Sequence, residues 1–323
     1  METNNFNIPI LFMVFNRLDT TKQVFEVIRK AAPQKLYLAS DGPRDNRIGE
    51  KEKVEKVRDY ILKSIDWNCE VKTLFREGNL GCGRAPAQAI TWFFDNEEMG
   101  IILEDDCLPS LSFFSYCKEL LEYYKDDTYI YHITGHNPLT LTKTPYSYYF
   151  ARIEHCWGWA SWRRAWNNFS FDIKGLNSFI EKKKINNIFN RNIDRYYWIN
   201  LFKKMENHEI DIWDYQWTYT IFNNNGVCIN PAKNFISNIG FNADGTHTTD
   251  SKSNLSNQQR FEIDKLVHPK EIKINNKLVI RINKDVFRIN LLWYCKIMIK
   301  ELLKKLSSKK GCYSEKINKF RLW

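Results

Sequence analysis

The sequence predicts an α/β protein in which a mostly parallel sheet carries helices on both faces, with a helical extension at the C-terminal end. Two observations support the sheet. Short apolar runs alternate with amphipathic segments over the first 130 residues, and polar or turn-forming residues close the runs. Such alternation is typical of parallel strands joined by crossover helices, which cover both faces. A third observation, helical periodicity among the lysines after residue 285, predicts the extension.

The first half of the chain divides into short strands and longer helices. The runs predicted as strands are 8–15, 35–40, 69–75, 100–103 and 128–135. The segments predicted as helices are 19–33, about 50–62, 84–98 and 109–124. Asp19 is a good N-cap for the first helix and Pro33 ends it, while Pro109 suits the first turn of the fourth.

The pattern changes after about residue 150. A tryptophan-dense stretch covers 155–169, in which Trp159, Trp162 and Trp166 recur at helical spacing, as a buried stripe does. Helices are predicted near 176–190, 194–207 and 213–224, and a strand that returns to the sheet at 226–230. The polar residues 240–260 predict a mobile loop.

Composition limits the class of protein. Apolar residues make up 43% and aromatic residues 15% of the chain, which is enough for a packed core and unlike a disordered protein. The sequence shows no signal peptide and no apolar run of about 18 residues. Its eight cysteines form no CxxC pair. We therefore expect a cytoplasmic protein with reduced thiols.

The net charge of +10 is concentrated near the C-terminal end, because residues from Asp264 onward include 16 basic and 5 acidic side chains. An enzyme acting on nucleic acid more often spreads its basic residues around the site, so we expect no nucleic-acid partner. Within 286–310, apolar residues recur among lysines at helical spacing. This predicts a basic amphipathic helix that binds an anionic membrane surface, with the protein peripheral at the inner face of the membrane. Docking on the protein's own core is the alternative.

Three consecutive carboxylates, Glu104, Asp105 and Asp106, follow the apolar run that ends at Leu103. Open α/β sheets bind ligands beyond the carboxyl ends of their strands, so these acids lie where a site is expected. Carboxylates bind hard cations such as Mg²⁺ or Mn²⁺, and Mg²⁺ is commonly held by one or two carboxylates together with substrate phosphates. The alternative is a turn whose acids cap the next helix.

Several sequence blocks occur in the order of a known family. They are PILFMVFNR, LASDG, REGNLG, LEDD with FFSYCKELL, HCWGWASWRRAW and WDYQW. Together they resemble nucleotide-sugar glycosyltransferases of the GT-A fold, which is Rossmann-like, and most closely the N-acetylglucosaminyltransferase I type and its bacterial relatives. The resemblance covers roughly residues 8–247. It implies a metal-dependent hexosyl- or N-acetylhexosaminyltransferase.

The resemblance implies a role for each acid of the LEDD block. Asp106 would be the direct ligand of a Mn²⁺ or Mg²⁺ ion. Asp105 would face the ribose or the water shell of the metal, and Glu104 the donor sugar or nucleotide. His247, in the polar loop, would complete the metal shell or touch the diphosphate; an exposed loop histidine is the alternative.

The resemblance also assigns donor contacts after the first two strands. Asn16 and Arg17, which directly follow the first strand, would reach the nucleotide or its phosphates; a surface arginine at a helix start is the alternative for Arg17. Asp41 lies in an Asp-Gly-Pro turn after the second strand. It would accept a hydrogen bond from a uracil N–H, and a plain turn aspartate is the alternative.

The glycine-rich segment GNLGCGR, residues 78–84, fits neither a P-loop nor the GxGxxG pattern. Its glycines would let the backbone approach the donor, with Arg84 or Arg76 near phosphate. An ordinary loop is the alternative for each of these residues.

Two aromatic blocks in the second half are expected to bind the acceptor and to supply a base. Trp157, Gly158 and Trp159 would let a sugar approach and stack on an indole face. Asp214, an acid flanked by aromatic residues, would take the proton of the acceptor hydroxyl, because such surroundings desolvate a carboxylate and raise its pKa. Asp211 is the competing candidate, and an acid that merely begins a helix is the alternative.

We therefore expect sugar transfer from a nucleotide diphosphate sugar to a glycan or lipid-linked glycan, with UDP as the expected nucleotide and with inversion; a retaining outcome stays open. The catalytic domain is predicted over 1–262, with a nucleotide-binding part over about 1–135 and an acceptor part over about 136–262. A basic region follows over 263–323. One alternative is a sugar nucleotidyltransferase, although the lysine- and glycine-rich phosphate loop expected near its first strand is absent. The other is a non-catalytic carbohydrate-binding relative.

Overall fold

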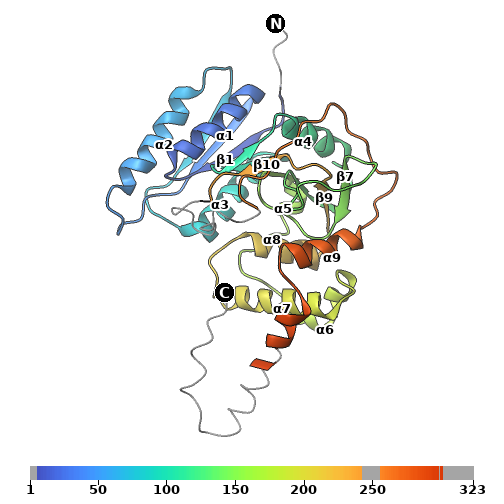
Figure 1. Ribbon diagram of the computed structural model, residues 1–323. Coiled ribbons are helices and arrows are strands. Elements are labelled where there is room, and N and C mark those ends of the chain that lie inside the picture. Colours follow the sequence, from blue (N-terminus) through green and yellow to red (C-terminus); the bar gives the residue numbers. More distant parts are fainter. Residues whose placement is uncertain (1–5, 242–254, 298, 301–323) are drawn as a thin grey trace.

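The computed structural model describes residues 6–241, 255–297 and 299–300. The strands are β1 Ile10–Val14, β2 Lys35–Ser40, β3 Glu70–Phe75, β4 Met99–Glu104, β5 Cys107–Pro109, β6 Ile130–Thr134, β7 Tyr148–Ala151, β8 Trp159–Trp162, β9 Val227–Pro231 and β10 Ile236–Asn238. Eight of them form one sheet in the order β3-β2-β1-β4-β8-β6-β9-β7, and β10 pairs with β5 in a second, small sheet (Figure 1).

The main sheet has two halves of different character. In β3-β2-β1-β4 every neighbouring pair is parallel. In the other half β8 runs antiparallel to both β4 and β6, β7 runs antiparallel to β9, and only β6 and β9 are parallel. The predicted α/β class with a mostly parallel sheet is confirmed, and its parallel part is the half encoded first in the sequence.

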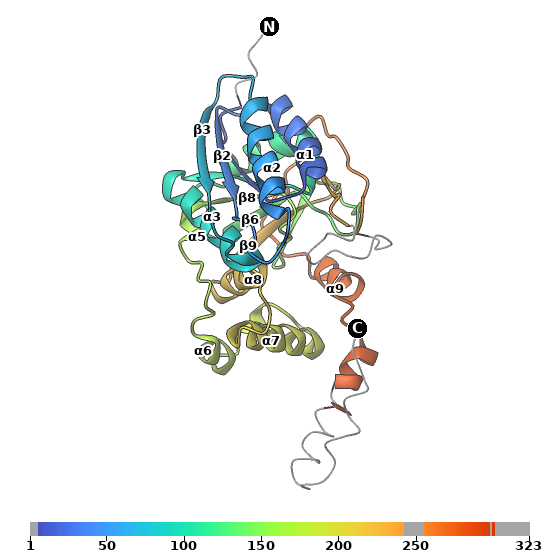
Figure 2. The same cartoon turned by 90° about the vertical axis from the view of Figure 1, so that its left-hand side faces the viewer.

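Helices cover both faces of this sheet. They are α1 Leu18–Ala31, α2 Glu50–Ser64, α3 Gly81–Asn96, α4 Ser112–Tyr123, α5 Arg163–Trp166, α6 Leu176–Glu181, η1 Lys184–Asn187, α7 Asn192–Glu206, α8 Asp214–Asn223 and α9 Asn276–Asp285. Residues of α1, α2 and α4 belong to one core cluster, and residues of α3 and α5 to α8 belong to the other. Figure 2 shows α1 and α2 on one side of the strands and α3 and α5 on the other.

The apolar run of β1 explains why this strand lies at the centre. All five of its residues are buried. Side chains alternate between the faces of a strand, so Ile10 and Phe12 enter the first core while Leu11 and Met13 enter the second. A strand that is apolar on both faces is stable only between two layers of helices, which is where β1 lies.

The segment after the acidic triplet differs from the prediction. The helix expected from Pro109 begins instead at Ser112, and Pro109 ends strand β5. Strand β5 pairs antiparallel with β10, whose Ile236 lies opposite Pro109. Because the two strands are more than 120 residues apart in the chain, no local pattern predicts their pairing. The first helix differs less: it begins at Leu18, so Asp19 lies in its first turn rather than at its N-cap.

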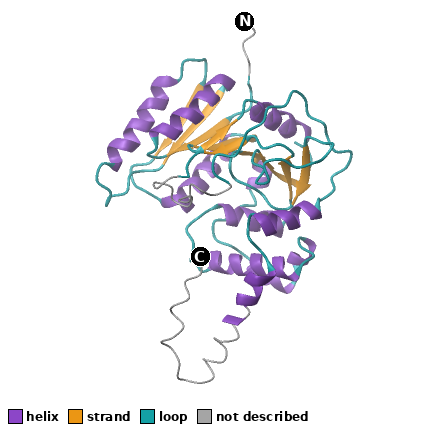
Figure 3. Ribbon diagram, viewed as in Figure 1, coloured by secondary structure: helices purple, strands orange, loops and turns teal. Residues whose placement is uncertain are grey.

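The tryptophan-dense stretch is also built differently from its pattern. Trp159, Trp162 and Trp166 are all buried, as expected of a core stripe. However, Trp159 and Trp162 belong to strand β8, and only Trp166 is in the short helix α5. A single helix was therefore the wrong inference from this spacing, because a strand followed by a helical turn can bury the same three residues. Figure 3 shows the helices of the second half gathered below the strands.

The C-terminal part packs against the body as far as Trp293 and Tyr294, whose rings lie beside Tyr197 and Tyr196 of α7. Leu266 is part of the first core cluster and Val279 of α9 part of the second, so packing continues past the predicted boundary at 262. Residues 286–290 are not helical, whereas 291–297 and 299–300 are; the rest of the predicted basic helix lies outside the described residues. Within the described chain, no helix combines the length and apolarity needed to cross a bilayer.

Candidate active site

Arg17 joins two of the three acids that follow β4. Its Nη2 atom donates to Asp105 Oδ1 at 2.5 Å and to Asp106 Oδ2 at 2.9 Å. The other Asp105 oxygen accepts from the backbone N–H of Phe15 at 3.2 Å. Strands β1 and β4 are parallel neighbours, so the residues just beyond their carboxyl ends meet. The structure therefore brings Arg17 together with the acidic triplet. Arg17 is 88 residues from Asp105 and 89 from Asp106 in the chain.

The side chain of the third acid, Glu104, has no hydrogen-bond or ion-pair partner among the described residues, although its backbone belongs to the β1–β4 ladder. Burial, followed by the charges of Asp106 and Asp105, raises the pKa of Glu104 to about 8. Burial also raises the pKa of Asp105 to about 6, although the charge of Arg17 acts in the opposite direction. Like charges in a buried site oppose one another's ionisation. A bound cation would relieve this repulsion, so the electrostatics favour one.

Gly240 closes the cluster from the side of β10. A Cβ atom added there would lie 2.2 Å from Asp106 Oδ2 and 2.7 Å from Arg17 Nη1. The backbone N–H of Ile239 donates to the carbonyl oxygen of Asp106 at 2.9 Å, which holds the segment in place. Only glycine leaves room for this approach. This contact could not be predicted from a glycine in a polar stretch, because it depends on the pairing of β5 with β10.

Asp214 is the first residue of α8 and lies within electrostatic range of the cluster. Its Oδ1 accepts from the N–H of Tyr215 at 3.0 Å, and Cys156 Sγ lies 3.8 Å from its Oδ2. After burial and the two neighbouring aspartates, its negative charge also contributes to the raised pKa of Glu104. The structure thus brings Asp214 toward the triplet from the opposite half of the sheet.

Glu154 is a second acid near Asp214, and the sequence analysis did not single it out. It is 6% exposed, and the hydroxyl of Thr218 in α8 donates to its carboxyl. Burial and then the charge of Asp214 raise the pKa of Glu154 to about 8. It is therefore mostly protonated at neutral pH, and an uncharged carboxyl beside Asp214 adds no repulsion. The only available signal was an acid directly before the tryptophan-dense stretch 155–169.

Asp211, the competing candidate for the base, has a structural position instead. An added Cβ on Gly83 would lie 2.3 Å from Asp211 Oδ1, and one on Gly81 would lie 2.8 Å from Asp211 Oδ2. The carboxylate therefore lies against the first turn of α3, where the helix dipole stabilises negative charge. Gly81 and Gly83 thus leave room for Asp211, while the approach of a donor to the 78–84 segment stays a prediction.

Asp41 also caps α3. Its carboxylate oxygens accept from the backbone N–H groups of Gly42 at 3.0 Å, Leu80 at 2.9 and 3.1 Å, and Gly81 at 3.1 Å. A carboxylate has about four acceptor sites, so these bonds occupy it. These bonds favour the turn-aspartate alternative over a bond to uracil. They form because the end of β2 lies beside the start of α3 in space.

The other predicted donor contacts are dispersed. Asn16 donates to Glu50 at 3.0 Å, and Glu50 is also bound by a neighbouring arginine. Arg76 donates to Gln88 of α3 at 3.2 Å. Arg84 is exposed on α3 and lies 4.7 Å from the ring centre of Phe171. None of the three contacts the acidic triplet in the described hydrogen bonds, so their roles stay predictions.

The three residues expected at the acceptor have different surroundings. Trp157 is partly exposed and lies beside the buried ring of His136, with centroids 4.5 Å apart. Gly158 has a φ of +59°, and an added Cβ would lie 2.5 Å from Ile236 Cδ1, so it is glycine for packing. Trp159 is 0% exposed and stacks on Trp213 at 5.7 Å. Its burial contradicts direct contact with an acceptor, and only Trp157 remains accessible.

The cluster fits a cation that takes few ligands from the protein. Within the described residues, no three His, Cys, Asp or Glu side chains converge as they would around a metal ion held by the protein alone. A Mg²⁺ ion bound through one or two carboxylates and substrate phosphates needs no such cage, and the triplet offers oxygen donors. His247 lies outside the described residues.

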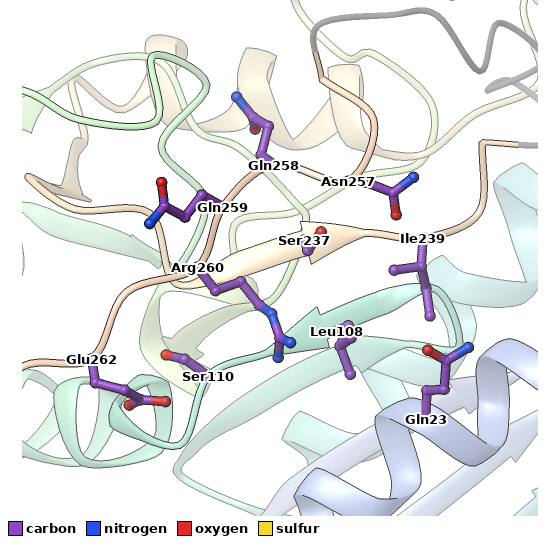
Figure 4. A pocket seen from close by; sticks show the side chains of 10 residues that line it. All are labelled: Gln23, Leu108, Ser110, Ser237, Ile239, Asn257, Gln258, Gln259, Arg260 and Glu262. Carbon is purple, nitrogen blue, oxygen red and sulfur yellow. The ribbon is translucent and has the colours of Figure 1, made fainter.

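A groove of about 510 Å³ lies beside the β5–β10 sheet (Figure 4). Its lining is rich in amides and hydroxyls, and includes Gln23, Leu108, Ser110, Ser237, Ile239, Asn257, Gln258, Gln259, Arg260 and Glu262. Arg260 donates to the carbonyl of Pro109, and Glu262 accepts from the N–H groups that begin α4. The buried hydroxyl of Ser110 has no partner among the described residues. Such a lining can bind a polyhydroxylated ligand.

Comparisons with known proteins show distant likenesses. No protein-family model matches the chain, and a search of curated proteins finds no match. HddC from Yersinia pseudotuberculosis is similar with a TM-score of 0.33 and 13% identity, over 53% of this chain and 86% of that one. TarS 1–349 from S. aureus is similar with a TM-score of 0.38 and 9% identity, and the likeness covers 71% of this chain and 59% of that one. The glycosyltransferase GlyE in Streptococcus pneumoniae TIGR4 is similar with a TM-score of 0.33 and 12% identity, and the likeness covers 67% of this chain and 44% of that one.

Proposed function

We propose that this protein is a metal-dependent glycosyltransferase that uses a nucleotide diphosphate sugar. The observation that carries the proposal is the cluster of Arg17, Glu104, Asp105 and Asp106 at the carboxyl ends of β1 and β4, with Asp214 close to it. A guanidinium and a carboxylate-bound cation together suit a diphosphate, whose negative charge grows as it leaves. A carboxylate close to the cluster suits the proton transfer that accompanies attack.

The residues around the diphosphate have distinct proposed roles. Arg17 would bind phosphate oxygens through its N–H donors, while Asp105 keeps its guanidinium oriented by the 2.5 Å bond. Asp106, with His247, would hold Mn²⁺ or Mg²⁺, which when bound supplies positive charge that stabilises the leaving group. Glu104 would face the donor sugar or nucleotide.

Asp214 is the proposed general base. Its carboxylate would accept the proton of the acceptor hydroxyl as that oxygen bonds to the anomeric carbon and the bond from that carbon to the diphosphate breaks. The expected outcome is inversion. Asp211 is less suited to this role because its carboxylate is packed against Gly81 and Gly83. Glu154 is a positioning residue in this proposal: it binds Thr218 of α8, the helix that begins with Asp214.

The acceptor is proposed to be a glycan or a lipid-linked glycan. Trp157 supplies a partly exposed ring on which a sugar can stack. The groove of Figure 4 begins next to the cluster, since Ile239 lines it and also donates to the carbonyl of Asp106. Its amides and hydroxyls are suited to further sugar units. The proposed donor is UDP-linked and carries a hexosyl or N-acetylhexosaminyl group; because Asp41 is engaged by backbone, it does not support a particular base.

The experiment that tests this function is donor hydrolysis by the full chain. UDP-sugars and GDP-sugars are incubated with Mn²⁺, with Mg²⁺ or with a chelator, and released nucleoside diphosphate is measured. We expect slow metal-dependent release that Arg17→Ala and Asp106→Asn remove. Binding is measured in parallel by thermal shift, because a donor that binds the folded state stabilises it.

Three results would overturn the proposal. The first is no stabilisation and no release with any donor. The second is release that does not depend on metal or on Asp106. The third is pyrophosphate release from a nucleoside triphosphate and a sugar phosphate, which would identify a sugar nucleotidyltransferase instead. Donor binding that is retained without turnover of any acceptor or water would support a non-catalytic carbohydrate-binding relative.

A further inference from the structure

The helical residues 291–297 and 299–300 present an apolar ridge that is exposed in the described part of the chain. Leu291 is 70%, Leu292 76% and Ile299 57% exposed. Leu291, Cys295 and Ile299 are four residues apart and therefore lie along one face of the helix; all three are exposed. Isolated exposed apolar residues are ordinary, but a row of them on one helix face indicates an interaction surface.

The opposite face of the same helix packs on the protein. Trp293 lies 5.4 Å from Tyr197 of α7 between ring centroids, and Tyr294 lies 5.3 Å from Tyr196. The preceding Ile289 is 1% exposed. The helix is thus anchored by its aromatic face, so the exposure of the ridge is not that of a detached segment. Figures 1 and 2 show it projecting beyond α7 and α9.

Basic residues flank the ridge. Lys296 and Lys300 are exposed and follow Leu292 at intervals of four residues, so this second row lies directly beside the first. On α9, Lys277, Arg281 and Lys284 are exposed on the side opposite its buried Val279 and Ile282. Arg281 is paired with Asp285 at 3.3 Å. The surface therefore combines aliphatic side chains with a local excess of positive charge.

We propose that the face formed by Leu291, Leu292, Cys295, Lys296, Ile299 and Lys300 docks on a lipid bilayer that contains anionic lipids. Aliphatic residues can enter the boundary between headgroups and acyl chains while flanking lysines bind anionic headgroups. Single-stranded nucleic acid is bound largely by stacking of its bases on aromatic rings, but Trp293 and Tyr294 are turned toward α7. Duplex nucleic acid is bound through its phosphates, and the aliphatic ridge offers nothing to them. This surface is separate from the acidic cluster, so the inference does not depend on the proposed chemistry.

The test compares binding of the full chain to vesicles of phosphatidylcholine alone and of phosphatidylcholine with phosphatidylglycerol. We expect sedimentation with the anionic vesicles only, weakened by added salt because the attraction is partly electrostatic. Leu291→Glu/Ile299→Glu should weaken binding by about tenfold or more, because it replaces two inserted side chains with negative charges. Lys296→Glu/Lys300→Glu should weaken binding to anionic vesicles as well.

A matched control is Ile48→Glu/Leu62→Glu. These two residues are also exposed, Ile48 at 107% and Leu62 at 45%. Ile48 lies just before α2 and Leu62 lies within it, and Figure 1 shows α2 far from the ridge. This variant makes the same change of charge and should bind like the unaltered protein. The melting temperature and the circular dichroism spectrum of every variant are compared with those of the unaltered protein, which shows whether the fold is retained independently of any donor.

Several outcomes would overturn the proposal. Equal sedimentation with neutral and anionic vesicles, or none with either, is one. An unchanged Leu291→Glu/Ile299→Glu variant is another. Self-association that this variant abolishes, without vesicle binding, would assign the ridge to a second copy of the chain. Binding to duplex DNA without binding to vesicles would assign the surface to nucleic acid.

Discussion

The two halves of the main sheet present opposite cases. In the half made of β3, β2, β1 and β4, strands alternate with helices along the chain, all neighbours are parallel, and the strand ends supply Arg17 and the acidic triplet. In the half made of β8, β6, β9 and β7, pairing is mixed and the order along the chain is not kept. This half, with α8, supplies Asp214 and Glu154. In the proposed mechanism the groups that bind the diphosphate and the metal therefore come from the regular half, and the proposed base comes from the irregular one.

The sharpest way to break this comparison is to remove the base. Asp214→Asn keeps the shape of the side chain but cannot take a proton in the same way. We expect sugar transfer to fall by about 10²–10⁴-fold, the usual contribution of a positioned base, while donor binding is retained. Once an acceptor has been found by screening glycans, the rate of transfer is measured with saturating donor.

Asp211→Asn is the matched control, because this carboxylate packs on the start of α3 rather than beside the cluster. We expect much less than the loss seen for Asp214→Asn. Near-normal transfer by Asp214→Asn would remove Asp214 from the mechanism and reopen the retaining outcome, for which no base on the opposite face is required.

The second prediction concerns the regular half. Asp106→Asn should lower metal-dependent release of the nucleoside diphosphate by about 10²–10³-fold, comparable to losing one group that stabilises transition-state charge. The fold should remain, because Asp106 lies beyond the end of β4 rather than inside it. Unaltered dependence of release on Mn²⁺ concentration in this variant would mean that the triplet only ends a strand.

The third prediction tests the contact of Gly240, which follows β10, with Asp106 and Arg17 of the regular half. Gly240→Ala places a Cβ atom 2.2 Å from Asp106 Oδ2, so Asp106 and Arg17 must shift. Displacements of this size can cost up to about 10²-fold in rate, and we expect roughly tenfold or more with little change in melting temperature. Gly78→Ala is the control, since an added Cβ there meets nothing within 4 Å. Equal activity of the two variants would show that Gly240 does not shape the site.

The smallest expected effect is on the pH dependence of stability. The folded-state pKa of Glu154 is raised from its ordinary value to about 8, so between these two values the folded protein binds more protons than the unfolded chain. Linkage then requires the contribution of Glu154 to stability to fall as pH rises through that window. Glu154→Gln keeps an oxygen that can accept from Thr218 and removes the titration.

The measurement is melting temperature against pH for the unaltered protein and for Glu154→Gln. We expect the unaltered protein to lose more stability toward pH 8, with the two curves closest at acidic pH. Parallel curves across the whole window would mean that the Glu154 carboxyl is not held protonated in the fold.

Much of the regular half could be predicted because its information is local. The run 100–103 matches β4 Met99–Glu104 and 35–40 matches β2, since an apolar run between turn residues has few other stable conformations. Parallel strands place their carboxyl ends at one edge, so the sequence placed Arg17 and the acids at the same edge of the sheet. Only the structure showed that β1 and β4 are neighbours and that Arg17 binds Asp105 and Asp106. The resemblance to a family then assigned the chemistry, which the structure does not test.

Other features depended on contacts between distant segments. Asp41 is in one motif that suggests ligand binding, and Gly81 and Gly83 are in another. In the structure Asp41 caps the start of α3, and the two glycines there leave room for Asp211. Trp159 is in a block that suggests sugar stacking, yet it is buried among other tryptophans. A local motif cannot show whether its polar groups are satisfied by the protein or left for a ligand, because the partners arrive from elsewhere in the chain.

The sequence by itself therefore determined the alternation of strands and helices, the edge of the sheet where carboxylates gather, and the basic character of the C-terminal region. The tertiary structure decided the pairing of β5 with β10, the close approach of Gly240 to Asp106, and the neighbours of Asp214. The physical reason is range. Periodicity and turn chemistry act over a few residues, whereas the packing of a side chain depends on the whole fold, which joins segments more than 100 residues apart.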